Sequence, residues 1–342
     1  MVNFEITATE AVVGLFTDLC SVKGSHITIT AIDESLYIAA ISPEFFKIVK
    51  LSTVPGLENF AIRLQKTMLK PMLSSACTLR FSIDSRVIIS RVVDTKTLSV
   101  LAVPLEYDFN SELIRHTVSS GASVNCEYDI SSLINLRPLL PFSDSGLQLK
   151  DNLAYVHGLD FIAYCKIVHG SNFIMTASNI SELIKFIRSC GKMQIYESDV
   201  YIVFKHGGRY FGCKQPIRFI DSEYSSYLSL VPLAKVECSL SELHLILKTF
   251  TIPKGEDPKC VFNLQKNLAT IKIGDTYHYD VSISNNQCNC KPFSLAVSVL
   301  KKIFSNTYLD YSRVTLFIYD SLISFRFNDI DILITRSDTW DI

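Results

Sequence analysis

The stretch Leu79-Arg-Phe-Ser-Ile-Asp-Ser-Arg-Val-Ile-Ile-Ser-Arg decides the fold, because its pattern occurs three times in the chain. It alternates apolar and polar residues, turns at an acid followed by serine, and alternates again, which is typical of a β-hairpin. The pattern returns at 193–205 and at 314–326, and the turns are 113 and then 123 residues apart. A repeat of this length predicts three similar small domains. The turns are Asp84-Ser85, Glu197-Ser198 and Asp320-Ser321.

Each unit contains the same further elements around that hairpin. A second hairpin lies upstream, with turns near 33–35, 150–152 and 265–267. Apolar residues at three-to-four spacing predict a helix between the two hairpins and another that opens each unit. Asp129 and Ser239 are good N-cap residues for two of the opening helices. The helices between hairpins are expected at 59–73, 179–190 and 293–304, and the opening helices at 7–20, 129–140 and 239–250.

The expected class is an α+β protein of three repeated domains, each in the order helix, hairpin, helix, hairpin. We place these domains at 1–106, 122–220 and 235–342. The intervening segments, 107–121 and 221–234, are polar and serine-rich, which is typical of connectors between domains.

Composition limits the classes of function. The chain has 342 residues, 48% of them hydrophobic, and a formal net charge of -1. Such a chain can bury substantial cores, but it has no overall attraction to phosphate, so any nucleic-acid surface must be local. The sequence shows neither a secretory signal nor an apolar run that could span a bilayer, which predicts a cytoplasmic protein. Its ten cysteines are scattered, which favours reduced core thiols over a disulfide framework.

Basic residues recur at matching places on the predicted helices. In the first two units they follow the spacing i, i+3, i+7, which places them on one helical face. The solvated face of an amphipathic helix accounts for any one of these clusters. Their recurrence in a nearly neutral chain favours a positive surface that contacts DNA phosphates without reading bases. The DNA-facing set is Arg63, Lys66, Lys70, Arg137, Lys185, Arg188, Lys192, Lys248, Lys301 and Lys302.

No arrangement of residues indicates catalysis. Cys288 and Cys290, with Cys260 and His278, lack the paired spacing that structural zinc sites use. Gly207-Gly208 lies inside a predicted hairpin and no helix follows, so it indicates a tight turn rather than a phosphate loop. No recognisable spacing brings a nucleophile and a base together. We therefore expect a protein that is not an enzyme and that has no cofactor or metal.

This layout resembles the β sliding clamp, the processivity subunit of bacterial replicative polymerases and of their phage relatives. Members of that family have three copies of a helix-hairpin-helix-hairpin unit, and two subunits close head to tail into a ring around duplex DNA. The resemblance covers essentially the whole chain. It implies a homodimer with helices inside the ring and sheets outside, which binds double-stranded DNA without sequence preference and tethers a DNA polymerase.

Two segments carry the local resemblance. Residues 153–165 are similar to the family's segment that leads through Thr-Asp-Gly-His-Arg-Leu-Ala, but Gly158 falls one position early and residues 159–161, Leu-Asp-Phe, replace the usual Gly-His-Arg. Residues 224–232 resemble the family's linker motif Phe-Pro-Asp-Tyr, which ends in Val-Leu-Pro; Tyr224, Tyr227 and Pro232 carry that match.

In the family these two segments, the start of the third unit's second helix and the C-terminal strand form an apolar groove. That groove binds short peptides of polymerases, clamp loaders and repair proteins. The resemblance places it here at His157, Leu159, Phe161, Ile162, Ser229, Leu230, Leu295, Leu333 and Thr335.

The C-terminal ending departs from the family. It is Arg336-Ser-Asp-Thr-Trp-Asp-Ile instead of apolar with Met-Pro-like residues, which indicates a changed peptide specificity and a diverged, phage-encoded member. Two other interpretations stay open. One is a clamp-like monomer that does not close and serves polymerase or viral transcription as a DNA-binding accessory factor, and native mass distinguishes it. The other is a DNA-modifying enzyme or inhibitor built on the same repeats, which a polar pocket unique to one unit would support.

Overall fold

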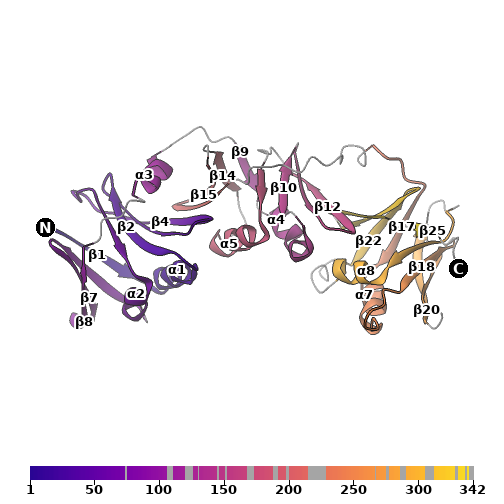
Figure 1. Cartoon of the computed structure of the whole chain (residues 1–342), viewed down its shortest axis with the longest axis horizontal. Coiled ribbons are helices and arrows are strands. Elements are labelled where there is room, and N and C mark those ends of the chain that lie inside the picture. The colour runs from indigo at the N-terminus through magenta and orange to yellow at the C-terminus, as the bar shows by residue number, and fades with distance from the viewer. Residues whose placement is uncertain are drawn as a thin grey trace. The chain divides into compact units, whose positions relative to one another are not determined.

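The computed structural model of this chain is rich in β-strands, with short helices between them (Figure 1). It describes residues 1–73, 75–105, 111–119, 126–129, 131–144, 146–150, 152–167, 173–187, 192–197, 200–214, 229–265, 267–274, 277–285, 290–304, 312–327, 330–335 and 337–338. Across these ranges no helix has both the length and the apolar character needed to cross a membrane.

One module, a strand followed by a helix and three further strands, occurs six times in the described residues. The first module is β1 (Val2–Ala8), α1 (Glu10–Ser21), β2 (His26–Ile32), β3 (Ser35–Ile41) and β4 (Phe45–Thr53). The second is β5 (Phe60–Leu64), α2 (Lys66–Met72), β6 (Cys77–Ile83), β7 (Arg86–Val93) and β8 (Lys96–Pro104). These two modules form the first repeat, and α3 (Ser111–Ser119) follows it.

The other two repeats have the same construction. The second repeat comprises β9 (Cys126–Asp129), α4 (Ser131–Leu136) with the 3-10 helix η1 (Arg137–Phe142), β10 (Leu147–Lys150), β11 (Leu153–His157), β12 (Phe161–Lys166), β13 (Phe173–Met175), α5 (Ala177–Ile187), β14 (Lys192–Glu197), β15 (Tyr201–His206) and β16 (Arg209–Lys214). The third comprises β17 (Ala234–Ser239), α7 (Leu240–Thr249), β18 (Lys259–Leu264), β19 (Leu268–Ile273), β20 (Tyr277–Asn285), β21 (Phe293–Ala296), α8 (Val297–Ile303), β22 (Arg313–Ile318), β23 (Leu322–Phe327), β24 (Ile330–Thr335) and β25 (Ser337–Asp338).

Within a repeat, the two modules exchange their first strands. β1 pairs antiparallel with β6 of the second module, and β5 pairs with β2 of the first. The third repeat does the same, because β17 pairs with β22 and β21 pairs with β18. Each strand that precedes a helix is therefore hydrogen-bonded to a part of the chain that is distant in sequence.

The chain divides into two compact units, Met1–Tyr128 with Glu182–Gln215 and Asp129–Ser181 with Pro216–Ile342. The first unit contains a four-stranded sheet, β1-β6-β7-β8, and an eight-stranded sheet, β5-β2-β3-β4-β16-β15-β14-β9. The second contains one 13-stranded sheet, β13-β10-β11-β12-β24-β23-β22-β17-β20-β19-β18-β21-β25. Each unit thus combines residues from two repeats, and the expected domain boundaries stay a prediction.

Several expected helices begin later than their sequence pattern indicates. The prediction of helix at 59–73 is wrong for its first part, because β5 occupies Phe60–Leu64 and α2 begins only at Lys66. The same correction applies at 293–304, where β21 precedes α8, and at 7–20, where β1 extends to Ala8 and Thr9 caps α1. The short strand and the helix follow each other directly, so their apolar residues merge into one pattern along the sequence.

Two further segments differ in detail from expectation. The helix expected at 129–140 is divided into α4 and η1, and prolines at 138 and 141 lie in the 3-10 portion. Proline cannot supply the backbone N–H that an α-helix needs, which explains the change in helix type. The expected connector at 107–121 contains the nine-residue helix α3.

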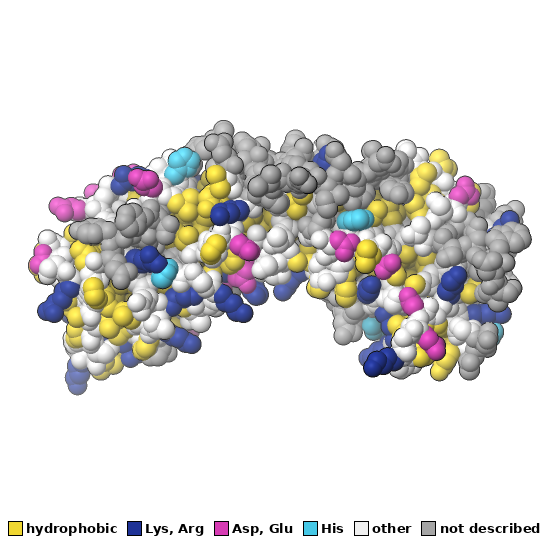
Figure 2. All heavy atoms as spheres, viewed as in Figure 1, with side chains coloured by type: hydrophobic (Ala, Val, Ile, Leu, Met, Phe, Trp, Pro, Cys, Tyr) yellow, Lys and Arg dark blue, Asp and Glu magenta, His cyan; other side chains and the backbone are white. Residues whose placement is uncertain are grey.

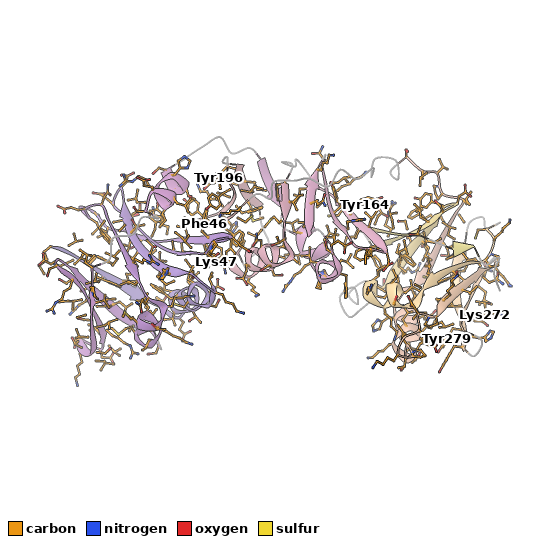
Figure 3. All side chains as sticks on the ribbon, viewed as in Figure 1. Phe46, Lys47, Tyr164, Tyr196, Lys272 and Tyr279 are labelled. Carbon is orange, nitrogen blue, oxygen red and sulfur yellow. The ribbon has the colours of Figure 1, made fainter. Side chains whose placement is uncertain are left out.

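Alternation along β4 separates two faces of the eight-stranded sheet. Lys47 points to the side of α1 and α5, where its Nζ lies 3.3 Å from Asp18 and 2.9 Å from Glu182. Its neighbours Phe46 and Ile48 point to the opposite side and pack in a cluster with Ile114 of α3. Figure 3 shows Lys47 and Phe46 in this part of the first unit.

Lys47 is fully buried in this sheet, with a side chain that is 0% exposed. A buried ammonium must be neutralised, and two carboxylates from different helices do so. Burial alone would raise the pKa of Glu182, but hydrogen bonds from Lys47 and Lys185 outweigh it and lower that pKa. The ion cluster therefore fixes α1 of the first repeat and α5 of the second against the strand β4.

We expect Lys47→Met to destabilise the first unit by about 3 kcal/mol, because it leaves two partly buried carboxylates without their common partner. Urea unfolding followed by far-UV circular dichroism measures this change in the free energy of unfolding. Lys185→Met is the matched control, since it removes an exposed ion pair to the same Glu182 and should cost less than about 1 kcal/mol. Equal effects of the two variants would show that burial of Lys47 is energetically unimportant.

Candidate functional site

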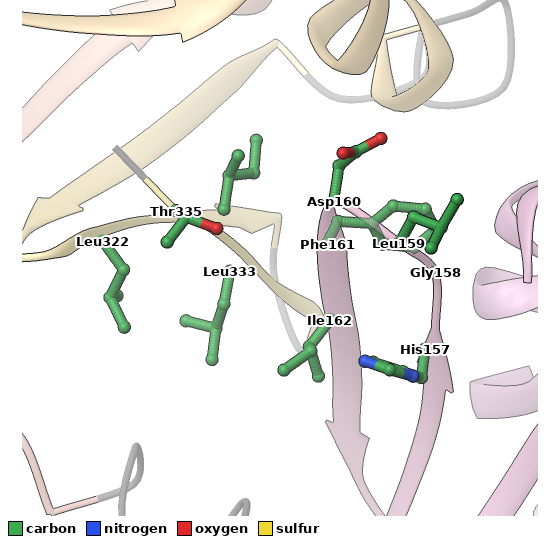
Figure 4. A pocket seen from close by; sticks show the side chains of 10 residues that line it. His157, Gly158, Leu159, Asp160, Phe161, Ile162, Leu322, Leu333 and Thr335 are labelled. Atoms are coloured by element: carbon green, nitrogen blue, oxygen red, sulfur yellow. The ribbon is translucent and has the colours of Figure 1, made fainter. Parts of the chain in front are cut away.

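A cleft of about 200 Å³ lies in the second unit where β12 pairs with β24. One wall is the end of β11, the turn at 158–160 and the start of β12 (Figure 4). The other wall is the start of β23 and the end of β24. Its lining residues are His157, Gly158, Leu159, Asp160, Phe161, Ile162, Leu322, Leu333, Ile334 and Thr335.

Strand register brings the two walls together. Ile162 lies opposite Leu333 across the β12–β24 pair, and Phe161 lies opposite Ile334. On the other side of β24, Thr335 lies opposite Leu322 of β23. The cleft therefore lies at a junction between the second and third repeats, on strands whose two edges are both hydrogen-bonded.

The turn before β12 depends on Gly158. Its backbone N–H donates to the Phe161 carbonyl at 2.9 Å. A Cβ at this position would lie 2.8 Å from the Phe142 carbonyl oxygen and 2.5 Å from the Phe161 ring. Only glycine permits so close an approach, which explains this residue in the wall of the cleft.

The cleft has apolar side chains on its floor and a polar lining of similar extent around them. Leu322 is 4% exposed and Leu333 is 6% exposed, whereas Leu159 on the turn is 89% exposed. Asp160 at the rim forms an ion pair with Lys302 of α8 at 3.4 Å. A concave apolar floor with an exposed leucine beside it is suited to receiving apolar side chains of a ligand.

A polar network lies on the same sheet beside the cleft. Arg326 donates two hydrogen bonds to Asp331, at 2.7 and 3.0 Å, and Ser324 donates a third at 3.0 Å. Burial and the neighbouring carboxylate of Asp331 raise the pKa of Tyr164, so this phenol stays protonated. Because the network is internally satisfied, it holds β12, β23 and β24 in position rather than supplying a reactive group.

Six residues of the expected groove meet in this cleft: His157, Leu159, Phe161, Ile162, Leu333 and Thr335. Three do not line it. Leu295 is buried within β21, and Ser229 and Leu230 are exposed residues that precede β17.

Sequence reasoning missed four lining residues. Gly158 and Asp160 belong to the same turn as Leu159, so contiguity along the chain could have identified them. Ile334 is adjacent to Leu333. Leu322 could not have been found locally, because it reaches the cleft only through the pairing of β23 with β24.

The expected DNA-facing residues fall into distinct environments. Arg63 is not on a helix; it lies on β5, opposite Thr28 of β2 and partly buried. Lys70, Arg137 and Lys248 are exposed on α2, η1 and α7. Lys185 and Lys302 are 55% and 38% exposed, and each forms an ion pair with a nearby carboxylate. Arg188 lies outside the described residues. The prediction that Lys192 lies on a helical face is wrong, because Lys192 is the first residue of β14; its side chain is not described.

Lys66 and Lys301 make equivalent contacts in the first and third repeats. Lys66 of α2 donates to the carbonyl of Val22, the C-cap of α1, and Lys301 of α8 donates to that of Phe250, the C-cap of α7. A cation at a helix C-terminus satisfies carbonyls that the helix leaves unpaired and interacts favourably with its dipole. In two repeats, then, a lysine of the second helix anchors the end of the first.

The described residues contain no group of three or more His, Cys, Asp or Glu side chains that could hold a metal ion. Cys288, part of the zinc arrangement considered above, lies outside them. Burial raises the pKa of Cys213 and of Cys238 to about 12, so these thiols are poor nucleophiles at neutral pH.

No protein-family model matches the sequence, and no curated protein matches it. Solved structures do match along nearly the whole chain. The DNA polymerase sliding clamp from Pseudomonas aeruginosa, with ligand, has a TM-score of 0.74 at 13% identity, covering 98% of this chain and 100% of that one. The DNA polymerase III subunit beta sliding clamp from Bartonella birtlesii has a TM-score of 0.72 at 12% identity, covering 99% and 100%.

The Helicobacter pylori beta clamp bound to a DNA ligase peptide has a TM-score of 0.71 at 12% identity, covering 98% of this chain and 99% of that one. These likenesses confirm the expected α+β fold: the chain has the fold of a sliding clamp from end to end. At this identity they show the fold alone.

We expect Gly158→Ala to destabilise the protein by about 2 kcal/mol, because the added methyl group overpacks the turn against backbone and ring atoms. Gly14→Ala is the matched control: it lies within α1 with nothing within 4 Å of its added Cβ, and should be neutral or stabilising by up to about 1 kcal/mol. Urea midpoints of both variants measure the difference. If Gly158→Ala is as stable as the control, the close approach of the Phe142 carbonyl and the Phe161 ring does not require glycine at position 158.

Proposed function

We propose that this chain is a DNA sliding clamp, a processivity factor that encircles duplex DNA and tethers a DNA polymerase. The observation that carries the proposal concerns two sheet edges, those of β8 and β20. They correspond in position to the strand edges that join one repeat to the next inside the chain. The fold shared with bacterial clamps over 98% of the chain supports it.

Inside the chain, repeats are joined by the last strands of two modules. β4 pairs with β16, and β12 pairs with β24, each over five residues. The other two modules whose last strand does not join a second repeat end in β8 of the first repeat and β20 of the third. β8 pairs with β7, and β20 pairs with β19 and, through its final residues, with β17. A second copy of the chain would join β8 of one copy to β20 of the other.

The two internal junctions share one register, which fixes the register of the proposed one. Phe46, opposite the last residue of β3, faces Gly212; Ile162, opposite the last residue of β11, faces Leu333. The equivalent of Phe46 is Tyr277, and the equivalent of Gly212 is Ala102. Across the proposed interface Ala102 therefore faces Tyr277, and Val100 faces Tyr279.

Exposure along these edges supports the same pairing. Val100 is 61% exposed and Tyr277 is 42% exposed, so apolar side chains lie on strands whose outer edges have unused hydrogen-bonding groups. Such edges associate readily unless they are covered. Two identical head-to-tail junctions cover all of them and close a dimer with two-fold symmetry.

The DNA surface in this proposal is formed by cations on the helices. Lys70, Arg137, Lys185 and Lys248 are exposed there and Lys302 is partly exposed, with Arg188 as a further candidate; Lys192 would add to this surface from the start of β14. Figure 2 shows Lys and Arg side chains over the side of the first unit that bears α1 and α2. With a net charge of -1, the chain would hold DNA through this local surface, which contacts phosphates and allows sliding.

The polymerase and the clamp loader would bind through short peptide segments in the cleft at the β12–β24 junction. A clamp of the same fold has been solved with a DNA ligase peptide, which supports a peptide-binding role. The role needs no catalytic residue, since a closed ring keeps the tethered polymerase at a high effective concentration near the primer end. The unusual ending after Thr335 favours a phage-encoded clamp with its own partner specificity.

We expect the wild-type chain to be a dimer and Val100→Glu to weaken dimerisation at least about tenfold, because a carboxylate would be buried against Tyr279 of the other copy. Light scattering over a range of concentrations measures this. Leu245→Glu on α7 is the control, since Leu245 is also 61% exposed but lies on no strand edge. A wild-type monomer would contradict the ring and favour the open accessory factor.

Closure around DNA predicts a topological difference in retention. With its loader present, the protein should stay on a nicked circular plasmid and be lost from the same plasmid after linearisation, because a ring slides off free ends. Gel filtration of the complexes at moderate salt measures retention. Equal, salt-sensitive binding to both forms would show simple electrostatic binding without encirclement.

A further inference from the structure

A helix of the connector after the first repeat crosses a strand junction. α3 lies against β2 of the first repeat, and Tyr196 on β14 of the second repeat donates a hydrogen bond from its hydroxyl to the Thr117 carbonyl of α3 at 2.8 Å. In the eight-stranded sheet β2 and β14 are five strand spacings apart, and the β4–β16 junction is the middle spacing. α3 therefore bridges the two repeats across the strands that join them.

Side chains complete this bridge. Five strand spacings are about 24 Å, whereas a helix of nine residues is only about 14 Å long. The long side chain of Tyr196, which is 6% exposed, covers part of the remaining distance from β14. Figure 1 shows α3 on the side of the sheet opposite α1, so the bridge and the helix α1 lie on different faces.

An apolar stripe on α3 joins a core that both repeats build. Ile114 is fully buried, and Leu113 and Val118 pack beside it, so the inward positions follow the spacing of one helical face. The cluster that these residues join draws side chains from each repeat. The first repeat contributes Ile32, Tyr37, Ala39, Phe46 and Ile48, and the second contributes Tyr196, Val203 and Tyr210. Loss of α3 would therefore expose apolar surface of both repeats at once.

At the centre of the junction, one of the two strands has no side chain. Phe46 of β4 lies opposite Gly212 of β16, and a Cβ at Gly212 would overlap the Phe46 ring. Glycine in a strand leaves the backbone without a side chain to cover it. The Phe46 ring, which belongs to the same cluster as Ile114, takes that place. Access of water to the backbone hydrogen bonds of the junction therefore depends on residues that α3 covers.

The opposite face of the junction is also held. Lys47 forms ion pairs with Asp18 of the first repeat and Glu182 of the second, so charges on one face and α3 on the other bridge the same two repeats. The strands β14, β15 and β16 accordingly belong to the same compact unit as the first repeat. The edge strand β8 has no comparable cover in the part of the chain that the structure describes, because Leu98 and Val100 are 57% and 61% exposed.

We infer that α3 is a strap, which keeps β16 joined to β4 and thereby holds the last three strands of the second repeat on the first repeat. The strap is a property of a single chain and needs no second copy. In the proposed ring it would keep this junction shut while the ring opens elsewhere to admit DNA, and that use alone rests on the proposed function. A connector between two repeats thus also serves as the element that locks them together.

Hydrogen–deuterium exchange of the full chain, followed by mass spectrometry, tests the strap. Arg115 is an exposed residue in the middle of α3, so Arg115→Pro keeps every apolar side chain of the helix but breaks its backbone hydrogen bonds. We expect amides of β4 and β16 to exchange at least about tenfold faster in this variant, because the junction opens more often. Amides of β6 and β7, in the other sheet of the same unit, should keep their wild-type rates. Arg115→Ala is the matched control and should exchange as the wild type does.

A milder variant keeps the test decisive if Arg115→Pro folds poorly. Tyr196→Phe removes only the hydrogen bond to the Thr117 carbonyl and should accelerate the same two strands about twofold or more. Unchanged exchange of β4 and β16 would overturn the inference, because the junction would then stay closed without α3. Equal acceleration of β6 and β7 would also overturn it, because α3 would then support the whole unit. The assay does not depend on oligomeric state, so a strapped monomer contradicts only the ring, and a dimer with unchanged exchange contradicts only the strap.

Discussion

Antiparallel pairing between the last strands of two modules is the constraint on which the rest of this structure depends. β4 with β16, and β12 with β24, convert separate small sheets into continuous ones, and backbone hydrogen bonds satisfy edges that would otherwise be exposed. The cleft exists because one such junction brings a turn of the second repeat beside the final strand of the third. The same rule leaves β8 and β20 as the edges that a second copy would join.

Side chains reinforce each junction in a different way. At the first, buried Lys47 is shared by Asp18 and Glu182 on the helix side of the sheet. At the second, Arg326 and Asp331 form a bidentate pair beside Tyr164 of the neighbouring strand. Buried or partly buried charges add little net stability, but they penalise any register that separates them. Of these contacts, Lys47–Glu182 and Tyr164–Asp331 join two repeats, whereas Arg326–Asp331 lies within the β23–β24 hairpin of the third.

The surface of a strand junction differs between the two units. In the first unit α3 covers it and completes a small apolar cluster. In the second unit the equivalent positions line an open cleft whose floor is apolar and whose rim carries the exposed Leu159.

The sequence by itself determined the threefold repeat, the hairpins and most helices, because alternation and three-to-four spacing are local patterns that survive without a partner. It also located six residues of the cleft through the family resemblance. Only the tertiary structure decided where β5 and β21 end and their helices begin, since those strands pair with segments far along the chain. For that reason Arg63 was misplaced on a helix, and Leu322, which reaches the cleft through strand register, had no local signal.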